Sequence, residues 1–199
     1  MHPAVFQAFD RICRARSAGG AVLEVGAVPS DDSLLCLPAL RGAASRVGIN
    51  LDGPHRHDGF EIVRGDANDM QCFGDSSFDT VLCNATLEHD PRFWLTLAAI
   101  RRVARPGAVV AIGVPGFDRL PSDTRLRRLG MLPGLPRWIR VPPAALACAT
   151  LTLQVHDFPG DYYRFSPQAV REVFCAGLRD VSVETVLVPP RAIGSGIRA

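Results

Sequence analysis

The chain has 199 residues, with 22 basic and 20 acidic side chains and a formal net charge of +2. Every basic side chain is arginine. This excludes a lysine Schiff base, a Walker-type phosphate lysine and a lysine general base. The near-neutral charge argues against a dedicated nucleic-acid-binding protein, which usually carries a strong basic excess.

The cysteines and the N-terminus indicate a cytoplasmic protein with reduced thiols. None of the six cysteines forms a CxxC pair, so neither a zinc ribbon nor a thioredoxin-type motif is indicated. The N-terminal segment carries Asp10, Arg11 and Arg14, which does not fit a secretory signal. No apolar run reaches the roughly 18 residues of a membrane-spanning helix.

Short apolar runs alternate with helical stretches, which is typical of βαβ units. We therefore predict an α/β fold, a Rossmann-like three-layer sandwich with a mostly parallel seven-stranded sheet. Residues 31–40 are expected to begin a helix, with Ser30 or Asp31 as N-cap. The other expected helices cover residues 3–17, 91–104 and 168–176. The expected strands cover residues 21–25, 46–51, 61–64, 78–83, 108–114, 180–187 and 192–197.

Residues 116–160 interrupt this alternation, and we interpret them as a helical or loop cap inserted into a single domain of residues 1–199. Six arginines lie among apolar residues between positions 119 and 140. This mixture indicates contact with a membrane surface, a lid over an anionic substrate or a solvated loop. The apolar segment 141–155 is too short to span a membrane and is expected to cover the site or to contact a second copy in a homodimer.

Polar side chains follow each of the first four predicted strands. In an open α/β sheet, ligands bind beyond the carboxyl ends of the strands. The pattern therefore predicts a nucleoside site at that edge of the sheet. A nicotinamide site is not indicated, because Gly-x-Gly-x-x-Gly is missing after the first strand.

The segment Phe78-Asp79-Thr80-Val81-Leu82-Cys83-Asn84, followed by Leu87-Glu88-His89, carries a family resemblance. With the next helix and Arg105-Pro106-Gly107, it resembles the class I S-adenosylmethionine-dependent methyltransferases, in particular the small bacterial domains of the type 11 group. The resemblance runs from about residue 20 to 115. It resumes weakly at residues 161–167.

The resemblance implies that Glu24, Gly26 and Ala27 line the cofactor S-adenosylmethionine. Gly26 would let the backbone approach the cofactor without a Cβ clash. The family's acid-x-Gly-x-Gly-x-Gly loop is degenerate here, since Val28 and Ser30 replace two glycines. An alternative role stays open for each of two residues. Glu24 would order this loop, and Gly26 would serve only a tight turn between strand and helix.

The resemblance assigns the other cofactor contacts to the next strand ends. Asn50 stands where the family has a ribose-binding acid, and Asp52 follows on the same strand face. Asp66 would accept from the adenine amine, with Ala67 beside the ring. The alternative for Asp66 is turn formation. Asn84 would line the methionine end of the cofactor.

The sequence predicts no metal site. Some related O-methyltransferases bind a divalent metal through Glu-x-x-Glu-His, but Ala85 occupies the first acidic position here. Glu88 and His89 are then expected to pack behind the site. Residues 55–58, His-Arg-His-Asp, are interpreted as a solvated loop.

The resemblance implies methyl transfer to a hydroxyl or amine of a small molecule, sugar or lipid-linked intermediate, with S-adenosylhomocysteine as product. His156 or His89 would act as the base, because histidine changes charge near neutral pH. Tyr162, Tyr163 and Arg164 would face the substrate. The alternative is a non-catalytic binding or scaffolding protein with a weakened cofactor site.

Overall fold

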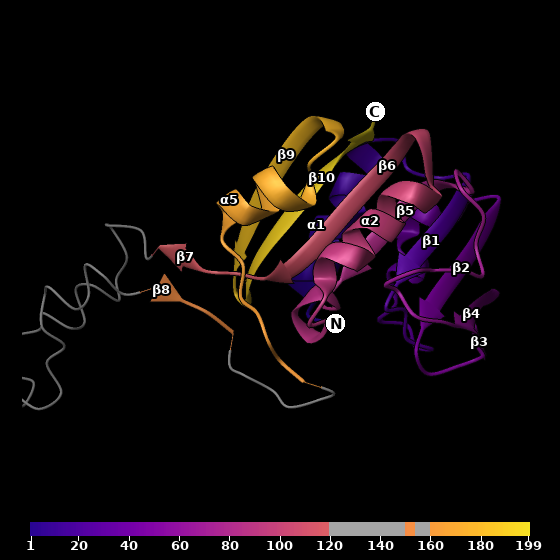
Figure 1. The fold of residues 1–199 in the computed structure, drawn as a ribbon, viewed down its shortest axis with the longest axis horizontal. Helices are drawn as coiled ribbons and strands as arrows, with labels where there is room; N and C mark the ends of the chain where they lie inside the picture. The colour runs from indigo at the N-terminus through magenta and orange to yellow at the C-terminus, as the bar shows by residue number, and fades with distance from the viewer. Residues whose placement is uncertain (120–149, 154–159) are drawn as a thin grey trace, which may run out of the picture.

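The computed structural model describes residues 1–119, 150–153 and 160–199. The α/β prediction is confirmed: one sheet has helices on both of its faces (Figure 1). The predicted sheet of seven strands is wrong by one, because the described chain forms eight, in the order β3-β4-β2-β1-β5-β6-β10-β9. The five strands from β4 to β6 are parallel, and β3, β10 and β9 pair antiparallel. Their bounds are β1 Ala21–Val25, β2 Ser45–Asn50, β3 His55–His57, β4 Phe60–Arg64, β5 Phe78–Asn84, β6 Ala104–Pro115, β9 Leu178–Leu187 and β10 Pro190–Arg198.

The additional strand is β3, which falls in the segment expected to be a solvated loop. Asp58 and Gly59 form the turn, both with positive φ. His55 then pairs with Ile62 of β4, and His57 pairs with Phe60. A polar sequence forms an edge strand here because its outer side needs no apolar partner.

Two helices match their predicted patterns. α1 spans Pro3–Ala15 and buries Val5, Phe9 and Ile12 against one face of the sheet. α2 spans Phe93–Val103 and covers the other face. Figure 1 shows α2 in front of the sheet and α1 behind it, which gives the three layers.

The prediction of a helix beginning within residues 31–40 is wrong. The segment instead forms two 3₁₀ turns, η1 Leu34–Cys36 and η2 Pro38–Leu40. Ser33 is the N-cap of the first turn, and its Oγ accepts from the Leu35 N–H at 3.2 Å. Pro38 lacks a backbone N–H and cannot continue an α-helix from η1.

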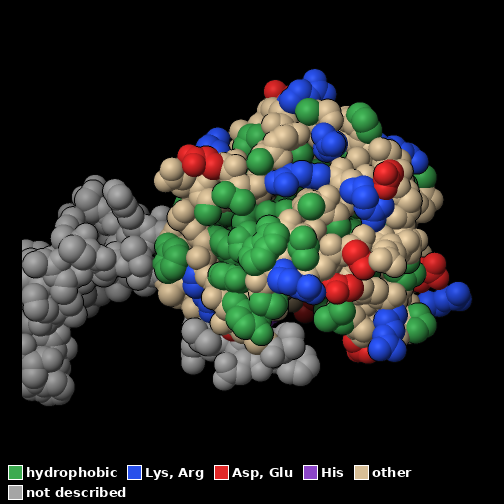
Figure 2. Space-filling view, viewed as in Figure 1, with side chains coloured by type: hydrophobic (Ala, Val, Ile, Leu, Met, Phe, Trp, Pro, Cys, Tyr) green, Lys and Arg blue, Asp and Glu red, His purple; other side chains and the backbone are tan. Residues whose placement is uncertain are grey.

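The last predicted helix is present but irregular. Ser166 caps it and Pro167 is its first residue. It begins as α5, Pro167–Ala169, and continues as the π-helical turn η4, Val170–Phe174. Figure 2 shows apolar side chains gathered on this side of the molecule, and the exposed apolar residues of α2 and η4 are Trp94, Leu95 and Val173.

Two short strands within the predicted cap form a small antiparallel ladder. β7, Asp118–Arg119, pairs antiparallel with β8, Thr150–Leu151. Residues 120–149 and 154–159 of the predicted cap 116–160 lie outside the described residues. Within the described parts of the chain, no helix is long and apolar enough to cross a membrane.

Candidate active site at the carboxyl ends of the parallel strands

The parallel strands bring their carboxyl ends to one edge of the sheet. Val25 of β1 lies in register with Ile49 of β2 and Cys83 of β5. Asn50 of β2 pairs with Arg64 of β4. The loops that carry the predicted cofactor residues therefore leave the sheet side by side, as the sequence indicated.

Glu24 is buried and is used inside its own loop. Its carboxylate accepts from the Ser33 hydroxyl, from the Leu34 N–H at 3.1 Å and from the Leu35 N–H at 3.4 Å. Burial raises the pKa of Glu24 from 4.5 to about 7, against the lowering effect of these hydrogen bonds. These contacts order the loop after β1, while a direct cofactor contact stays a prediction.

Gly26 has a left-handed φ of +77°. Thr86 occupies the space beside Gly26, since a Cβ added at position 26 would lie 2.0 Å from Thr86 Oγ1. Ala27 is fully buried and faces Gly48, where an added Cβ would lie 2.4 Å from Ala27 Cβ. Glycine is therefore required at position 26 because Thr86 fills the space that a side chain would need. A cofactor could contact only the backbone of this residue.

Asn50 and Asp52 differ in availability. Asn50 Nδ2 donates to the Ala27 carbonyl at 2.8 Å, and its Oδ1 accepts from the Asp52 N–H at 3.3 Å. β2 ends at Asn50, so the expectation that both project from one strand face is wrong. Asp52 lies in the following bend, and its exposed carboxylate is 3.2 Å from His55 Nε2.

Asp66 begins the turn after β4. Its Oδ1 accepts from the Asn68 N–H at 2.8 Å, the bond expected of a turn-forming aspartate. Ala67 is half-buried against the core that α2 covers. The side chain of Asp66 is exposed at the strand end, where the predicted adenine contact would be made.

Asn68, two residues after Asp66, was not predicted as a site residue. Its Nδ2 donates to Asp90 Oδ2 at 2.7 Å and to Thr96 Oγ1 at 3.0 Å. Its Oδ1 is buried and has no hydrogen-bond partner within the described chain. The polar run after β4 contains Asn68, but only Asp66 and its neighbour Ala67 were predicted from that run to contact the cofactor.

Asn84, at the end of β5, also has an unpartnered Oδ1 among the described residues. The residue is buried, and its side chain lies against Gly113 and near the ring of Phe9. A buried acceptor without a partner loses about 1–3 kcal/mol of hydration. Such a group fits a site that receives a donor or a cation from a ligand.

Glu88 lies in the 3₁₀ turn η3, Leu87–His89, and is completely buried. Its Oε1 is 3.6 Å from Arg191 Nη1 and 3.9 Å from His89 Nε2. Burial raises the pKa of Glu88, although Arg191 opposes that shift. Arg191, from β10, was missed because its position beside Glu88 depends on the antiparallel return of the chain.

His89 contacts the Gly160 carbonyl through Nδ1. A carbonyl oxygen only accepts, so Nδ1 carries the proton in this contact. In the neutral ring, Nε2 is then the basic nitrogen, and it points toward the Glu88 side. This geometry suits a base, whereas His156 lies outside the described residues.

The predicted substrate residues have unlike environments. Tyr163 donates its hydroxyl to the Pro91 carbonyl at 3.0 Å and packs against Phe93 and Phe165. Arg164 forms a two-pronged ion pair with Asp161, including a contact of 2.6 Å from Nη2. Tyr162 is exposed.

Comparison with known proteins gives both a family match and a fold match. Residues 38–112 match the family model described as a methyltransferase domain. The 1,6-didemethyltoxoflavin-N1-methyltransferase of Burkholderia thailandensis aligns with 98% of this chain and 79% of its own, at a TM-score of 0.65 and 17% identity. Residues 38–112 are therefore similar to the methyltransferase family, and the chain shares the fold of this methyltransferase.

The chain also resembles a protein named fatty-acid O-methyltransferase from Mycolicibacterium smegmatis, with 33% identity over 125 residues. That alignment covers 56% of this chain and 45% of the relative, so the chain spans less than half the length of that curated protein. A phosphoethanolamine N-methyltransferase structure from Haemonchus contortus has a TM-score of 0.59 at 12% identity, covering 96% of this chain and 52% of its own.

The range that matches the family model includes only part of the candidate site. Residues 38–112 include Asn50, Asp66, Asn84 and Glu88. They do not include Gly26 and the degenerate loop after β1. The fold is also shared by a structure titled the [4+2]-cyclase SpnF, at a TM-score of 0.60, so the fold by itself does not fix the reaction.

Proposed function

We propose that this protein transfers a methyl group from S-adenosylmethionine to an oxygen or nitrogen of a small molecule. The observation that carries the proposal is Asn84 Oδ1, which has no partner among the described residues and is buried at the end of β5 inside the region that matches the methyltransferase family. Asn68 Oδ1 adds a second unpartnered acceptor after the neighbouring strand end.

The chain offers groups for each part of the cofactor. Asp52 and Asn50 would meet the ribose, and Asp66 would accept from the adenine amine. Asn84 would face the methionine end, where its carbonyl dipole suits a positively charged group. S-Adenosylmethionine supplies a methyl group that is already activated on a sulfonium, so the protein mainly aligns the acceptor with it.

A hydroxyl acceptor must also lose a proton. His89 would take it at Nε2, since Nδ1 is held by the Gly160 carbonyl. Glu88, buried on the Nε2 side, would stabilise the imidazolium that forms. His156 remains the second predicted base.

The acceptor is proposed to be a hydroxyl or amine of a small molecule, a sugar or a lipid-linked intermediate, admitted beneath residues 116–160. The name of the Mycolicibacterium relative supports a lipid and an oxygen acceptor. The net charge of +2 gives no support to a nucleic-acid substrate. A cytoplasmic location, homodimer formation and surface contact with membranes through residues 119–140 stay predictions.

Isothermal titration with S-adenosylmethionine and S-adenosylhomocysteine tests the proposal. Asp66→Ala should weaken binding by about 1–3 kcal/mol, because it removes a partner of a desolvated amine. Asp69→Ala, in the same turn, is the matched control and should bind as the wild type does. Equal affinity of Asp66→Ala and wild type would remove Asp66 from the adenine role.

A non-catalytic binding protein is the second candidate. It is favoured by the loop after β1, where Glu24 and Asn50 are already bonded within the chain. The same titration separates the two. Absence of heat with millimolar S-adenosylmethionine would reject the transferase, whereas binding without methyl transfer to any tested acceptor would favour the second candidate.

A further inference from the structure

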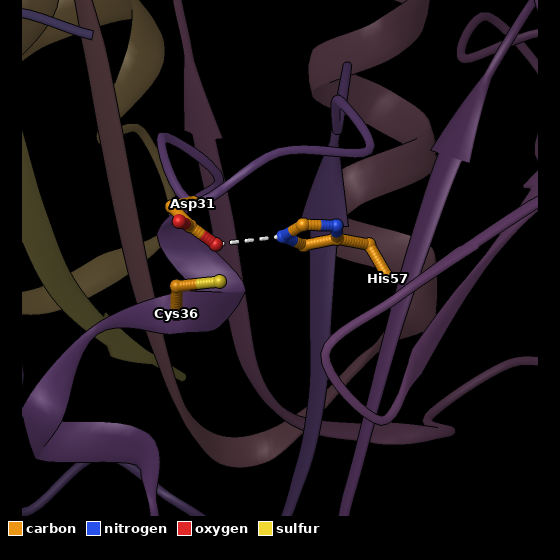
Figure 3. Close-up of side chains that lie close together, drawn as sticks. All are labelled: Asp31, Cys36 and His57. Atoms are coloured by element: carbon orange, nitrogen blue, oxygen red, sulfur yellow. Dashed lines mark hydrogen bonds and ion pairs between the residues drawn. The ribbon is translucent and has the colours of Figure 1, made fainter.

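Three side chains with different metal-binding atoms converge near the β3 edge of the sheet (Figure 3). Asp31 and Cys36 come from the segment after β1, and His57 comes from β3. One carboxylate oxygen, the thiol sulfur and one ring nitrogen all lie within 4.8 Å of one another. Asp31 Oδ1 is 2.8 Å from His57 Nε2.

The two segments that carry these residues are fastened together by Arg46 of β2. Its Nη1 donates to the Leu35 carbonyl at 2.7 Å, and its Nη2 donates to the Asp58 carbonyl at 2.8 Å. Leu35 precedes Cys36, and Asp58 follows His57. The guanidinium therefore holds the backbone beside both ligands, which reduces the ordering that ligand binding would require.

The remaining supports come from each segment separately. The Glu24 carboxylate accepts from the N–H groups of Leu34 and Leu35, which fixes the turn that ends at Cys36. The His57 ring packs edge-on against Phe60, with ring centroids 5.7 Å apart. A site held by such contacts is better defined than three residues on a free loop.

We propose that Asp31, Cys36 and His57 bind a divalent transition-metal ion of the zinc type. A thiolate, an imidazole and a carboxylate are the ligands that Zn²⁺ takes in proteins. One thiolate and one carboxylate also balance the two positive charges of the ion. Three protein ligands leave one tetrahedral position for water or for a ligand.

Asp58 is the nearest further carboxylate. Its Oδ2 is 4.0 Å from Cys36 Sγ, but it is also 3.9 Å from Arg46 Nη1. Because the guanidinium offsets its charge, Asp58 belongs to the surroundings of the ion and is not required as a ligand. Because a thiol binds metal as the thiolate, metal binding would release the Cys36 proton to solvent.

This cluster is separate from the candidate transferase site. His57 pairs with Phe60, the first residue of β4, whereas Asp66 follows the carboxyl end of that strand. An open hollow of about 670 Å³ lies next to His57, and Arg46, Arg56 and Glu61 contribute to its lining. The metal proposal therefore does not depend on methyl transfer.

Titration of the reduced full-length protein with Co²⁺ tests the metal site directly. We expect one equivalent to bind, with a thiolate-to-cobalt charge-transfer absorption that excess Zn²⁺ abolishes. Cys36→Ser should abolish this absorption. Asp31→Asn and His57→Ala should weaken binding by more than about 100-fold, beyond the effect usual for residues behind a metal ligand.

Two matched controls identify the ligands. Cys72→Ser removes an exposed thiol outside the cluster, and His55→Ala removes the other histidine of β3. Both should bind Co²⁺ as the wild type does. Absence of the absorption at a large molar excess of Co²⁺, or its persistence in Cys36→Ser, would overturn the proposal. Thermal melts in metal-free buffer would identify a variant that loses binding because it fails to fold.

Discussion

The two halves of the strand-end edge treat their polar groups differently. Beside β1 and β2, Glu24 and Asn50 are bonded within the chain, to Leu34 and Ala27 among others. Beside β5, Asn84 Oδ1 has no partner in the described chain, and both carboxylate oxygens of Glu88 lack a hydrogen bond there.

The difference separates groups that build the site from groups that are left for a ligand. A paired buried group stabilises the loop that carries it, whereas an unpaired buried group lowers stability. Such a loss is characteristic of positions where function opposes stability. We therefore expect the β1–β2 half to act as the frame of the proposed site and Asn84 in the β5 half to meet the ligand, while Glu88 keeps its ion pair with Arg191.

The largest expected effect comes from the β5 half. Arg191→Ala should destabilise the protein by about 3–5 kcal/mol, because it leaves the buried Glu88 carboxylate without its counter-charge. Arg191→Met combined with Glu88→Leu should recover most of that loss. Urea unfolding measures both variants.

The exposed pair Arg105–Asp79 is the control for that experiment. Arg105→Ala should change stability by only about 0–1 kcal/mol, since water screens the pair. A similarly small effect of Arg191→Ala would show that the buried pair contributes no more than a surface one.

In the β1 half, the pKa of Glu24 near 7 gives a pH dependence with a defined sign. A carboxyl group whose folded pKa exceeds its unfolded value favours folding when protonated. Its contribution is complete below about pH 4.5 and is lost as pH rises through about 7. Relative to Glu24→Gln, the wild type should lose about 3 kcal/mol across that window. Parallel stability–pH curves for the two proteins would contradict this assignment.

Gly26→Ala tests whether the frame itself needs this glycine. The substitution combines a left-handed backbone with a Cβ placed 2.0 Å from Thr86 Oγ1, so we expect a loss of about 2–4 kcal/mol. Gly107→Ala has a similar φ of +86° but meets nothing within 4 Å. It should lose only about 1–2 kcal/mol.

Adding Thr86→Ala to Gly26→Ala should recover the part of the loss that comes from the clash. Thermal unfolding of the wild type, Gly26→Ala, Thr86→Ala and the double variant measures this coupling. If Gly26→Ala costs no more than Gly107→Ala, the contact with Thr86 does not explain the glycine.

The smallest expected effects contrast the two asparagines. Asn50→Ala removes the bond to the Ala27 carbonyl and should lower stability by about 1 kcal/mol. Asn84→Ala removes an acceptor that has no partner in the described parts of the chain, so stability should stay within about 0.5 kcal/mol of wild type. Its affinity for S-adenosylhomocysteine should nevertheless fall. A large loss of stability in Asn84→Ala would show that this side chain belongs to the frame.

The strands and the first two long helices could be predicted because their apolar periods are continuous. β1 begins and ends where the alternation placed it, and α1, Pro3–Ala15, lies within the predicted range 3–17. Predictions failed where a local pattern competes with tertiary contacts. Residues 34–40 form 3₁₀ turns because Glu24 and Pro38 dictate their hydrogen bonding, and β3 forms because the edge of β4 offers it a partner.

The sequence by itself determined the α/β class, the polar strand ends at one edge of the sheet and the absence of lysine chemistry. These follow from composition and from patterns within short windows of the chain. Only the tertiary structure decided which polar groups are already paired. It brought Arg191 to Glu88 through β10, and Cys36 to His57 across the sheet edge. Hydrogen bonds and ion pairs depend on distances of a few ångströms between residues far apart in the chain, which no local pattern specifies.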